Sequence, residues 1–241
     1  MLGSASIGFD LGSPRAPRTL ASAICERLRS EILSAALLPG QKLNIALQAK
    51  RFSVSLAAVR EALSRLVSEG LVEAVDQRGF RVRPVSTRDL LDLTRTRIEI
   101  DGLALRHSIE DGGRDWEQGL RDAHERLSRV PRLDPADPSR HSDVWGAAHS
   151  AFHGALVGGC RSAWLGVFRT ILHEQSERYR RLSVPLEQVG RDVAAEHRRL
   201  AEAALARDVN AAQQALADHY QRTTDIILAA DVALLRESFA A

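Results

Sequence analysis

Two histidines, His149 and His153, lie four residues apart within the segment HSAFHGALVGGC, residues 149–160. A spacing of four places both imidazoles on one face of a helix, where they could supply two nitrogen ligands to a metal ion. The alternative is a helix with two unrelated histidines, each satisfied by a local hydrogen bond. The two interpretations differ in whether other parts of the chain provide further ligands.

Two more histidines occur in later segments with a helical pattern. His197 lies in AAEHRRLAEAAL, and His219 lies in ALADHYQRTTDIIL. Helices of a bundle can direct imidazoles to one point in the core, and imidazole suits divalent transition metals, with zinc and nickel as the leading candidates. No HExxH or CxxC motif fixes the geometry, so four unrelated histidines remain an alternative. The sequence predicts surface or loop positions for the others, which are His107, His124, His141 and His173.

The segments that must position these histidines are helical from residue 86 onward, and strand-like runs are nearly absent there. Helical patterns cover about 86–110, 114–129, 139–158, 162–182, 187–206 and 209–237. Because these patterns are separated by breaks that contain Gly or Pro, we expect an antiparallel all-helical bundle over residues 86–241.

The residues before this bundle show a different order of elements. Thr19 and Ser55 are of the type that caps helices, and they predict helices that begin at these two positions. A short helix is expected from about Ile45 to Phe52, and Gly70 is expected to end the helix that Ser55 begins. Two runs of β-forming residues then flank 77–79, which predicts a hairpin with glycine at its tip.

This order of elements is typical of a winged helix-turn-helix, which we assign to residues 19–85. A small α+β domain without a nucleic-acid role is the alternative. Residues 1–18 are rich in Gly, Ser, Ala and Pro and are predicted to be a disordered tail. The residues expected to face the core are Leu20, Ala23, Ile24, Leu28 and Ile32 on the first helix, and Leu56, Val59, Leu63, Leu66 and Val67 on the third.

Charge is distributed unevenly along the 241 residues. Residues 1–85 carry 12 Lys or Arg against 7 Asp or Glu, whereas the remainder carries 21 against 24. A basic first third predicts that this part meets a polyanion such as DNA. No apolar run approaches the roughly 20 residues of a membrane span, and the chain has only 2 cysteines, so we expect a cytoplasmic protein.

Several motifs, in order, resemble a known family. The segments LRSEILSAALLPGQKL, VREALSRLVSEGLV and QRGFRVRPVS resemble the winged helix-turn-helix of GntR-type bacterial regulators. The segments DLLDLTRTRIEIDGLALR, AFHGAL and EHRRLAEAALARD, followed by His219, resemble the all-helical FCD effector domain of the FadR-like branch. Within that branch, DLTRTRIE and HSAFHGALVGGC are most similar to the carbon-starvation type of regulator that controls glutarate use.

The resemblance implies a homodimeric DNA-binding repressor, not an enzyme, that responds to a small carboxylic acid bound near a metal. Under it, His153, His197 and His219 match the three histidine ligands of the family. His149 stands where many members have an aspartate. Glutarate or 2-hydroxyglutarate is the acid that the resemblance favours.

The resemblance also implies residues that bind the acid. Arg97 matches an arginine that faces the pocket, where its guanidinium fork suits a carboxylate, and Asp101 one turn later would orient it. A surface ion pair on a helix is the alternative. Arg95, Tyr179 and Arg180 are further candidates for the other end of a diacid.

The predicted DNA-reading helix departs from the family pattern. It begins Ser55-Leu56-Ala57-Ala58, where many relatives have Ser-Arg-Thr-Pro. Arg60 keeps its match and is expected to contact guanine or a phosphate, while Leu56 and Ala57 suit a thymine methyl group. Arg51, Arg78 and Gly79 are expected to add contacts from the preceding helix and the wing.

Two other functions fit parts of the pattern. A metal-dependent hydrolase fused to a helix-turn-helix would need a general base near the metal, and Glu196, next to His197, is the obvious candidate. Neighbouring helix residues point about 100° apart, which argues against it. A purely structural metal bundle would leave Arg97 without a carboxylate to bind.

Overall fold

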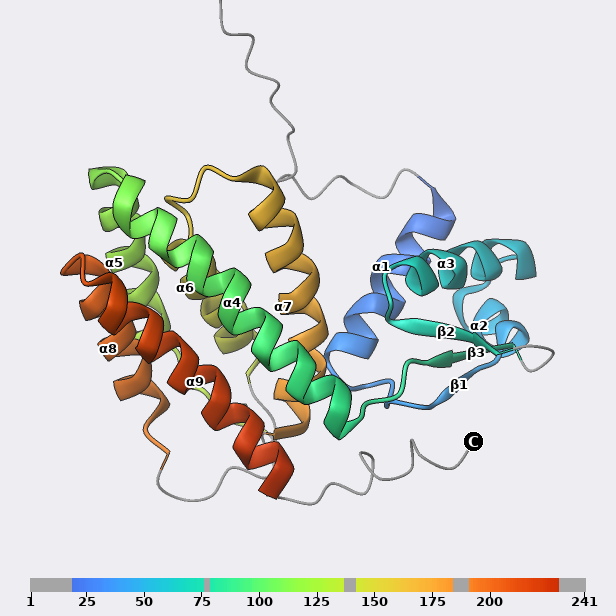
Figure 1. The fold of residues 1–241 in the computed structure, drawn as a ribbon. Helices are drawn as coiled ribbons and strands as arrows, with labels where there is room; N and C mark the ends of the chain where they lie inside the picture. Colours follow the sequence, from blue (N-terminus) through green and yellow to red (C-terminus); the bar gives the residue numbers. More distant parts are fainter. Residues whose placement is uncertain (1–18, 76–78, 137–141, 184–190, 230–241) are drawn as a thin grey trace, which may run out of the picture.

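In a computed structural model, the N-terminal part of the chain contains three capped helices and a small sheet (Figure 1). The structure describes residues 19–75, 79–136, 142–183 and 191–229. The helices are α1 (Leu20–Leu33), α2 (Ile45–Phe52) and α3 (Leu56–Ser68). The side chains of Thr19, Asn44 and Ser55 each accept a backbone N–H of the first turn, which satisfies a donor that the helix leaves unpaired. The predicted starts of these helices are confirmed.

The sheet contains the predicted hairpin and one additional strand. The strands are β1 (Lys42–Leu43), β2 (Val72–Val75) and β3 (Gly79–Val82). They pair antiparallel in the order β1-β3-β2, with Val75 opposite Gly79. Gly79 has a φ of +88°, a conformation that favours glycine and explains its place beside the turn. The strand β1 escaped prediction because two residues are too short to show an alternating pattern.

Two residues predicted to be buried are exposed. Leu20 and Leu56 have 58% and 55% of their surface exposed, so their assignment to the core was wrong. Each is the first residue of its helix, where the chain enters from outside, and the core contacts begin further along. On α3 the buried side chains are Val59, Ala62, Leu63 and Leu66.

The remaining described residues form a bundle of long helices (Figure 1). They are α4 (Thr87–Asp111), α5 (Arg114–Arg129), α6 (Asp143–Leu156), α7 (Ala163–Ser183), α8 (Val193–Leu205) and α9 (Val209–Ala229). The mainly helical fold class, with a winged helix-turn-helix before a helical bundle, is confirmed. The predicted tail 1–18 and the predicted helical residues 139–141, 187–190 and 230–237 lie outside the described residues.

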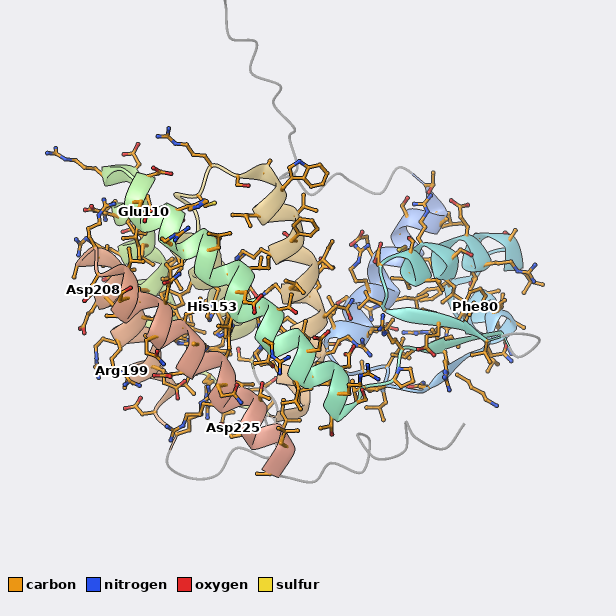
Figure 2. All side chains as sticks on the ribbon, in the orientation of Figure 1. Phe80, Glu110, His153, Arg199, Asp208 and Asp225 are labelled. Atoms are coloured by element: carbon orange, nitrogen blue, oxygen red, sulfur yellow. The ribbon has the colours of Figure 1, made fainter. Side chains whose placement is uncertain are left out.

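The bundle packs in pairs of helices around an apolar core. α4 packs against α7 and α9, α5 against α6 and α8, and α8 against α9. Trp116, Phe152, Leu200 and Leu216 are among the buried side chains that fill the space between them. In Figure 2, His153 lies within the bundle, surrounded by helices. The interior therefore holds polar side chains beside its apolar core.

The helix α7 lies on the side of the bundle that faces the N-terminal part, and it packs against α1 (Figure 1). It therefore contacts both parts of the chain. None of the described helices is long and apolar enough to cross a membrane.

Candidate metal centre, effector cavity and DNA face

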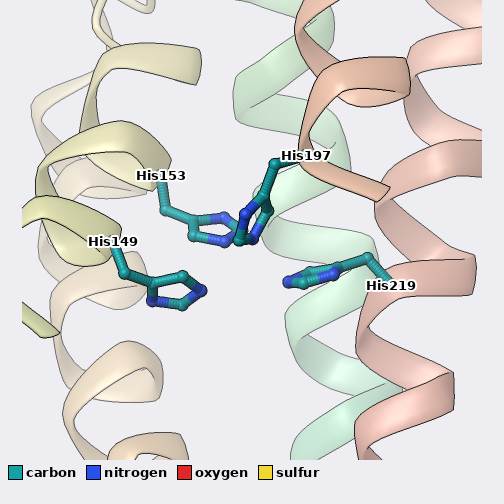
Figure 3. Close-up of side chains that lie close together, drawn as sticks. All are labelled: His149, His153, His197 and His219. Carbon is teal, nitrogen blue, oxygen red and sulfur yellow. The ribbon is translucent and has the colours of Figure 1, made fainter. Parts of the chain in front are cut away.

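Four histidines from three helices converge inside the bundle. His149 and His153 come from α6, and His197 and His219 come from α8 and α9, with all four rings directed toward one point (Figure 3). One nitrogen of each ring lies within 4.8 Å of a nitrogen of every other ring. The helical spacing of four residues therefore brings His149 and His153 together, as the sequence predicts.

The four rings are buried and uncharged. Their exposed fractions lie between 2% and 6%. Burial, followed by the charges of neighbouring cationic groups, holds the pKa of His149 and of His153 well below the ordinary value. Burial also lowers the pKa of His197 and His219, although the nearby Glu196 carboxylate opposes this effect. Neutral imidazoles with free lone pairs are the form that binds a metal.

Three of these rings contain a nitrogen that is buried without a hydrogen-bond partner. They are Nδ1 of His149, Nε2 of His153 and Nε2 of His197. An unpaired buried polar atom is costly, so these nitrogens call for a partner. A divalent transition metal bound by one nitrogen of each ring would supply partners within the cluster, so the residues present fit such an ion.

Glu196 does not have the position of a general base. Its carboxylate bonds Nδ1 of His219 at 2.8 Å and pairs with the Arg191 guanidinium at 2.9 Å. Although burial raises its pKa, the hydrogen bonds from His219 and Arg191 dominate and lower the pKa to about 2. A carboxylate that is held on both sides and hardly accepts a proton is a poor base, which removes the main support for a hydrolase.

A cavity of about 50 Å³ adjoins the histidine cluster. Its lining includes His149, His153 and His219 together with the apolar Leu90 and Leu93. Of the predicted acid-binding residues, those that line it are Arg97, Tyr179 and Arg180. Arg95 is exposed on α4 and is absent from the lining. The structure therefore brings three of the four predicted residues to one cavity.

Arg97 is fixed at the edge of this cavity by partners on α4 and α9. Its guanidinium lies 3.5 Å from Asp101 and stacks 4.0 Å above the Tyr220 ring. Asp101 is itself buried, accepts a 2.6 Å hydrogen bond from Tyr220 and lies 3.7 Å from Arg169 on α7. Nε of Arg97 is buried without a partner, so the side chain retains a donor for a ligand.

Tyr179 and Arg180 occupy different surroundings within the cavity wall. The Tyr179 hydroxyl donates to Asp89 at 2.6 Å and accepts the Ser86 N–H at 3.3 Å. Arg180 pairs with Glu177 and lies over the Trp145 ring at 5.5 Å. Tyr179 therefore joins the cavity to the start of α4, and much of the Arg180 charge is already balanced.

The N-terminus of α3 is open to solvent. Ser55, Leu56, Ala57 and Arg60 are all exposed there. Gly79, the first residue of β3, is also exposed. The structure thus leaves this surface free for DNA.

The other two predicted DNA contacts have different positions. Arg51 forms an ion pair with Glu31 on α1, so its charge is directed into its own domain. Arg78 lies outside the described residues.

The chain matches two protein families over most of its length. Residues 20–82 match the bacterial regulatory proteins of the gntR family, and residues 92–222 match the FCD domain. The chain is a GntR-family regulator with an FCD domain. It is 39% identical over 210 residues to the uncharacterized HTH-type transcriptional regulator BphR of Paraburkholderia xenovorans (strain LB400), covering 87% of this chain and 86% of BphR.

One further relative agrees with this family, and a solved structure shares the fold. The regulator is 32% identical over 204 residues to the HTH-type transcriptional repressor GlaR of Escherichia coli (strain K12), covering 83% of this chain and 92% of GlaR. Its fold is similar to that of E. coli McbR/YncC, with a TM-score of 0.68 at 21% identity, covering 88% of this chain and 99% of the other. The regulator binds DNA through its helix-turn-helix and an effector through its FCD domain, and it is not an enzyme.

Several residues that line the cavity were not predicted from the sequence. His173, predicted at the surface, is largely buried in the cavity wall, and burial lowers its pKa to about 4. Its Nε2 lies 3.1 Å from the Ser150 hydroxyl on α6. Thr94 and Thr224, whose hydroxyls lie 2.7 Å apart, also line the cavity. The sequence predicts helices at these residues, which lie on α4, α7 and α9. It does not show that the three helices pack around one cavity.

Proposed function

We propose that this regulator is a cytoplasmic, homodimeric repressor that a small carboxylic acid releases from its operator. In this proposal His149, His153, His197 and His219 hold a divalent transition metal, with zinc and nickel as the first candidates. The DNA head comprises residues 19–85 and the effector domain residues 86–241. The observation that carries the proposal is a cluster of four neutral, partly unpaired histidines, of which His149, His153 and His219 line the same cavity as Arg97.

The chemistry of the cavity favours a carboxylate as the effector. A bound transition metal would supply a Lewis-acidic centre for a carboxylate oxygen. Arg97 lines the same cavity, keeps an unpaired Nε donor and is held in place by Asp101 and Tyr220. By resemblance, glutarate and 2-hydroxyglutarate are the first acids to test.

The size of the cavity links binding to movement. A space of about 50 Å³ holds only a few water molecules at roughly 10–15 Å³ each. We therefore propose that a five-carbon diacid widens the cavity by displacing side chains of its wall, including those of α7. A ligand shifts an equilibrium only by its difference in affinity for two states, and a cavity that must widen provides that difference.

The helix α7 connects this wall to the DNA head. Gln175 donates to the Glu69 carbonyl at 3.1 Å, and Arg178 donates to the Arg83 carbonyl. Tyr179 contacts Ser86 in the connection to α4. Because the same helix lines the cavity through His173 and Glu177, we propose that its displacement by the acid moves the DNA head.

An exposed apolar surface supports the homodimer. Trp164, Phe168 and Ile171 lie on one face of α7 and are 72%, 50% and 50% exposed. A contiguous set of large apolar side chains is typical of an interaction surface. Two copies would place two α3 helices on half-sites about one helical turn, or a small multiple, apart.

The proposal is tested by selecting an operator from random DNA with the purified regulator and then measuring operator affinity. We expect tight binding by the zinc- or nickel-loaded regulator and at least tenfold weaker binding when glutarate or 2-hydroxyglutarate is added. The variant Arg97→Lys should bind the operator equally but respond less to the acid. If no small carboxylic acid changes operator affinity, the proposed effector class is wrong.

The identity of residue 149 provides a second test. His149 stands where the family pattern has an aspartate, so a neutral nitrogen replaces an anionic oxygen at this position. The metal centre is therefore one charge more positive, which strengthens its binding of an anion. The variant His149→Asp should therefore bind the acid more weakly while keeping the fold. Equal acid affinity in the two proteins would contradict this reasoning.

A further inference from the structure

Glu196 and His197 are neighbours in the sequence, but the Glu196 carboxylate contacts the other side of the cluster. Its Oε2 atom lies 2.8 Å from Nδ1 of His219 on α9. Both side chains are buried, with 8% and 6% of the residue surface exposed. The contact therefore joins α8 to α9 through a polar bond inside the bundle.

Arg191 fixes the same Glu196 carboxylate through two hydrogen bonds. Its Nε atom donates to Oε1 at 3.0 Å, and its Nη2 atom donates to Oε2 at 2.9 Å. The same Nη2 atom lies 3.1 Å from the Thr223 hydroxyl and 3.4 Å from the His219 carbonyl. This two-pronged contact determines both the charge and the orientation of the carboxylate.

The arrangement determines which nitrogen of His219 carries the proton. Because Arg191 donates to both oxygens, the Glu196 side chain is an acceptor, and Nδ1 of His219 must be the donor. In a neutral ring the lone pair then resides on Nε2. That nitrogen lies on the side of the ring away from Glu196, and His219 is directed toward the other three histidines (Figure 3).

We propose that Glu196 and Arg191 are positioning residues that preset the tautomer and the ring orientation of His219 before a metal binds. The inference rests on the metal site of the proposed function and assigns that site an outer carboxylate. Removal of such a partner typically costs about 10–100-fold in metal affinity.

The first experiment needs no metal. Nitrogen NMR of the histidine rings in the metal-free regulator should show His219 with its proton on Nδ1, assigned by comparison with His219→Gln. The variant Glu196→Ala should lose this preference, whereas Glu196→Gln, whose amide oxygen still accepts the bond, should retain it. A wild-type His219 with its proton on Nε2 would overturn the inference.

The second experiment measures zinc affinity by competition with a chelator. We expect Glu196→Ala to bind zinc about 10–100-fold more weakly and Glu196→Gln to lose less. The matched control is Glu202→Gln, which changes an exposed carboxylate on the same helix and should bind as the wild type does. Unfolding midpoints of the metal-free proteins identify any variant that fails to fold, and the nearly isosteric Glu196→Gln keeps the test decisive.

The two experiments separate this inference from the proposed function. If the wild type binds zinc and Glu196→Ala binds it equally well, the positioning role is wrong and the metal site stands. If the wild type binds neither zinc nor nickel, the metal site itself is wrong. The NMR measurement then decides whether Glu196 sets the tautomer of His219.

Discussion

Acid should destabilise the metal-free regulator through its buried histidines. Burial holds the pKa of His149, His153 and His197 well below the value of about 6.5 that an unfolded chain shows. Between these two values the unfolded state binds more protons than the folded state, so stability falls as the pH falls. The contribution is fully present above about pH 6.5 and is lost progressively below it.

The loss can be estimated from the unfolded state alone. An unfolded histidine with a pKa of about 6.5 gains roughly 1.4 kcal/mol from protonation at pH 5.5, and a folded one that stays neutral gains almost nothing. Three such histidines together cost about 4 kcal/mol. This is a large part of the 5–15 kcal/mol that typically separates folded from unfolded proteins.

Urea unfolding of chelator-treated protein between pH 7 and pH 5.5 measures this loss. The variant His153→Gln removes one titrating group and should lose about 1 kcal/mol less than the wild type over this range. The control Leu156→Ala, in the same helix, should be less stable at every pH but keep the wild-type pH dependence. Identical pH dependence in His153→Gln and the wild type would show that protonation of His153 does not contribute to acid destabilisation.

Three further predictions address the acid, the DNA and the connection between them. Arg97→Lys should bind the acid about tenfold more weakly by calorimetry, because lysine lacks the two-pronged donor; equal affinity would exclude a carboxylate contact. Arg60→Ala should lose about 1–3 kcal/mol of operator affinity by fluorescence anisotropy, and no loss would remove Arg60 from the DNA interface. Arg178→Ala should bind acid and DNA but show a weaker effect of acid on DNA affinity, and undiminished coupling would contradict a role for α7.

Local features of the sequence predicted the elements well. Thr19 and Ser55 mark helix starts because a side-chain oxygen must satisfy the first N–H groups, and that requirement is local. The pair His149 and His153 was predictable for the same reason, since helical spacing alone places both rings on one face. Convergence with His197 and His219 depended in addition on the order in which helices pack.

Features that depend on packing were not predictable. His173 has the sequence surroundings of a surface residue, and only the approach of α6 to α7 buries it. Glu196 was predicted as a possible base because it directly precedes His197 in the sequence. Its carboxylate instead bonds His219, which lies on another helix. Leu56 fits the apolar period of α3, but its place at the first position of the helix leaves it in solvent.

Native mass spectrometry of the purified regulator, sprayed without chelator, shows whether the histidine cluster holds a metal. We expect a dimer that carries one divalent metal ion per chain, and the variants His153→Ala and His197→Ala should lose that mass. A carboxylic acid that copurifies would appear as a further, weighable mass. A chain that stays metal-free after zinc or nickel is added would show that the four histidines hold no metal and have a purely structural role.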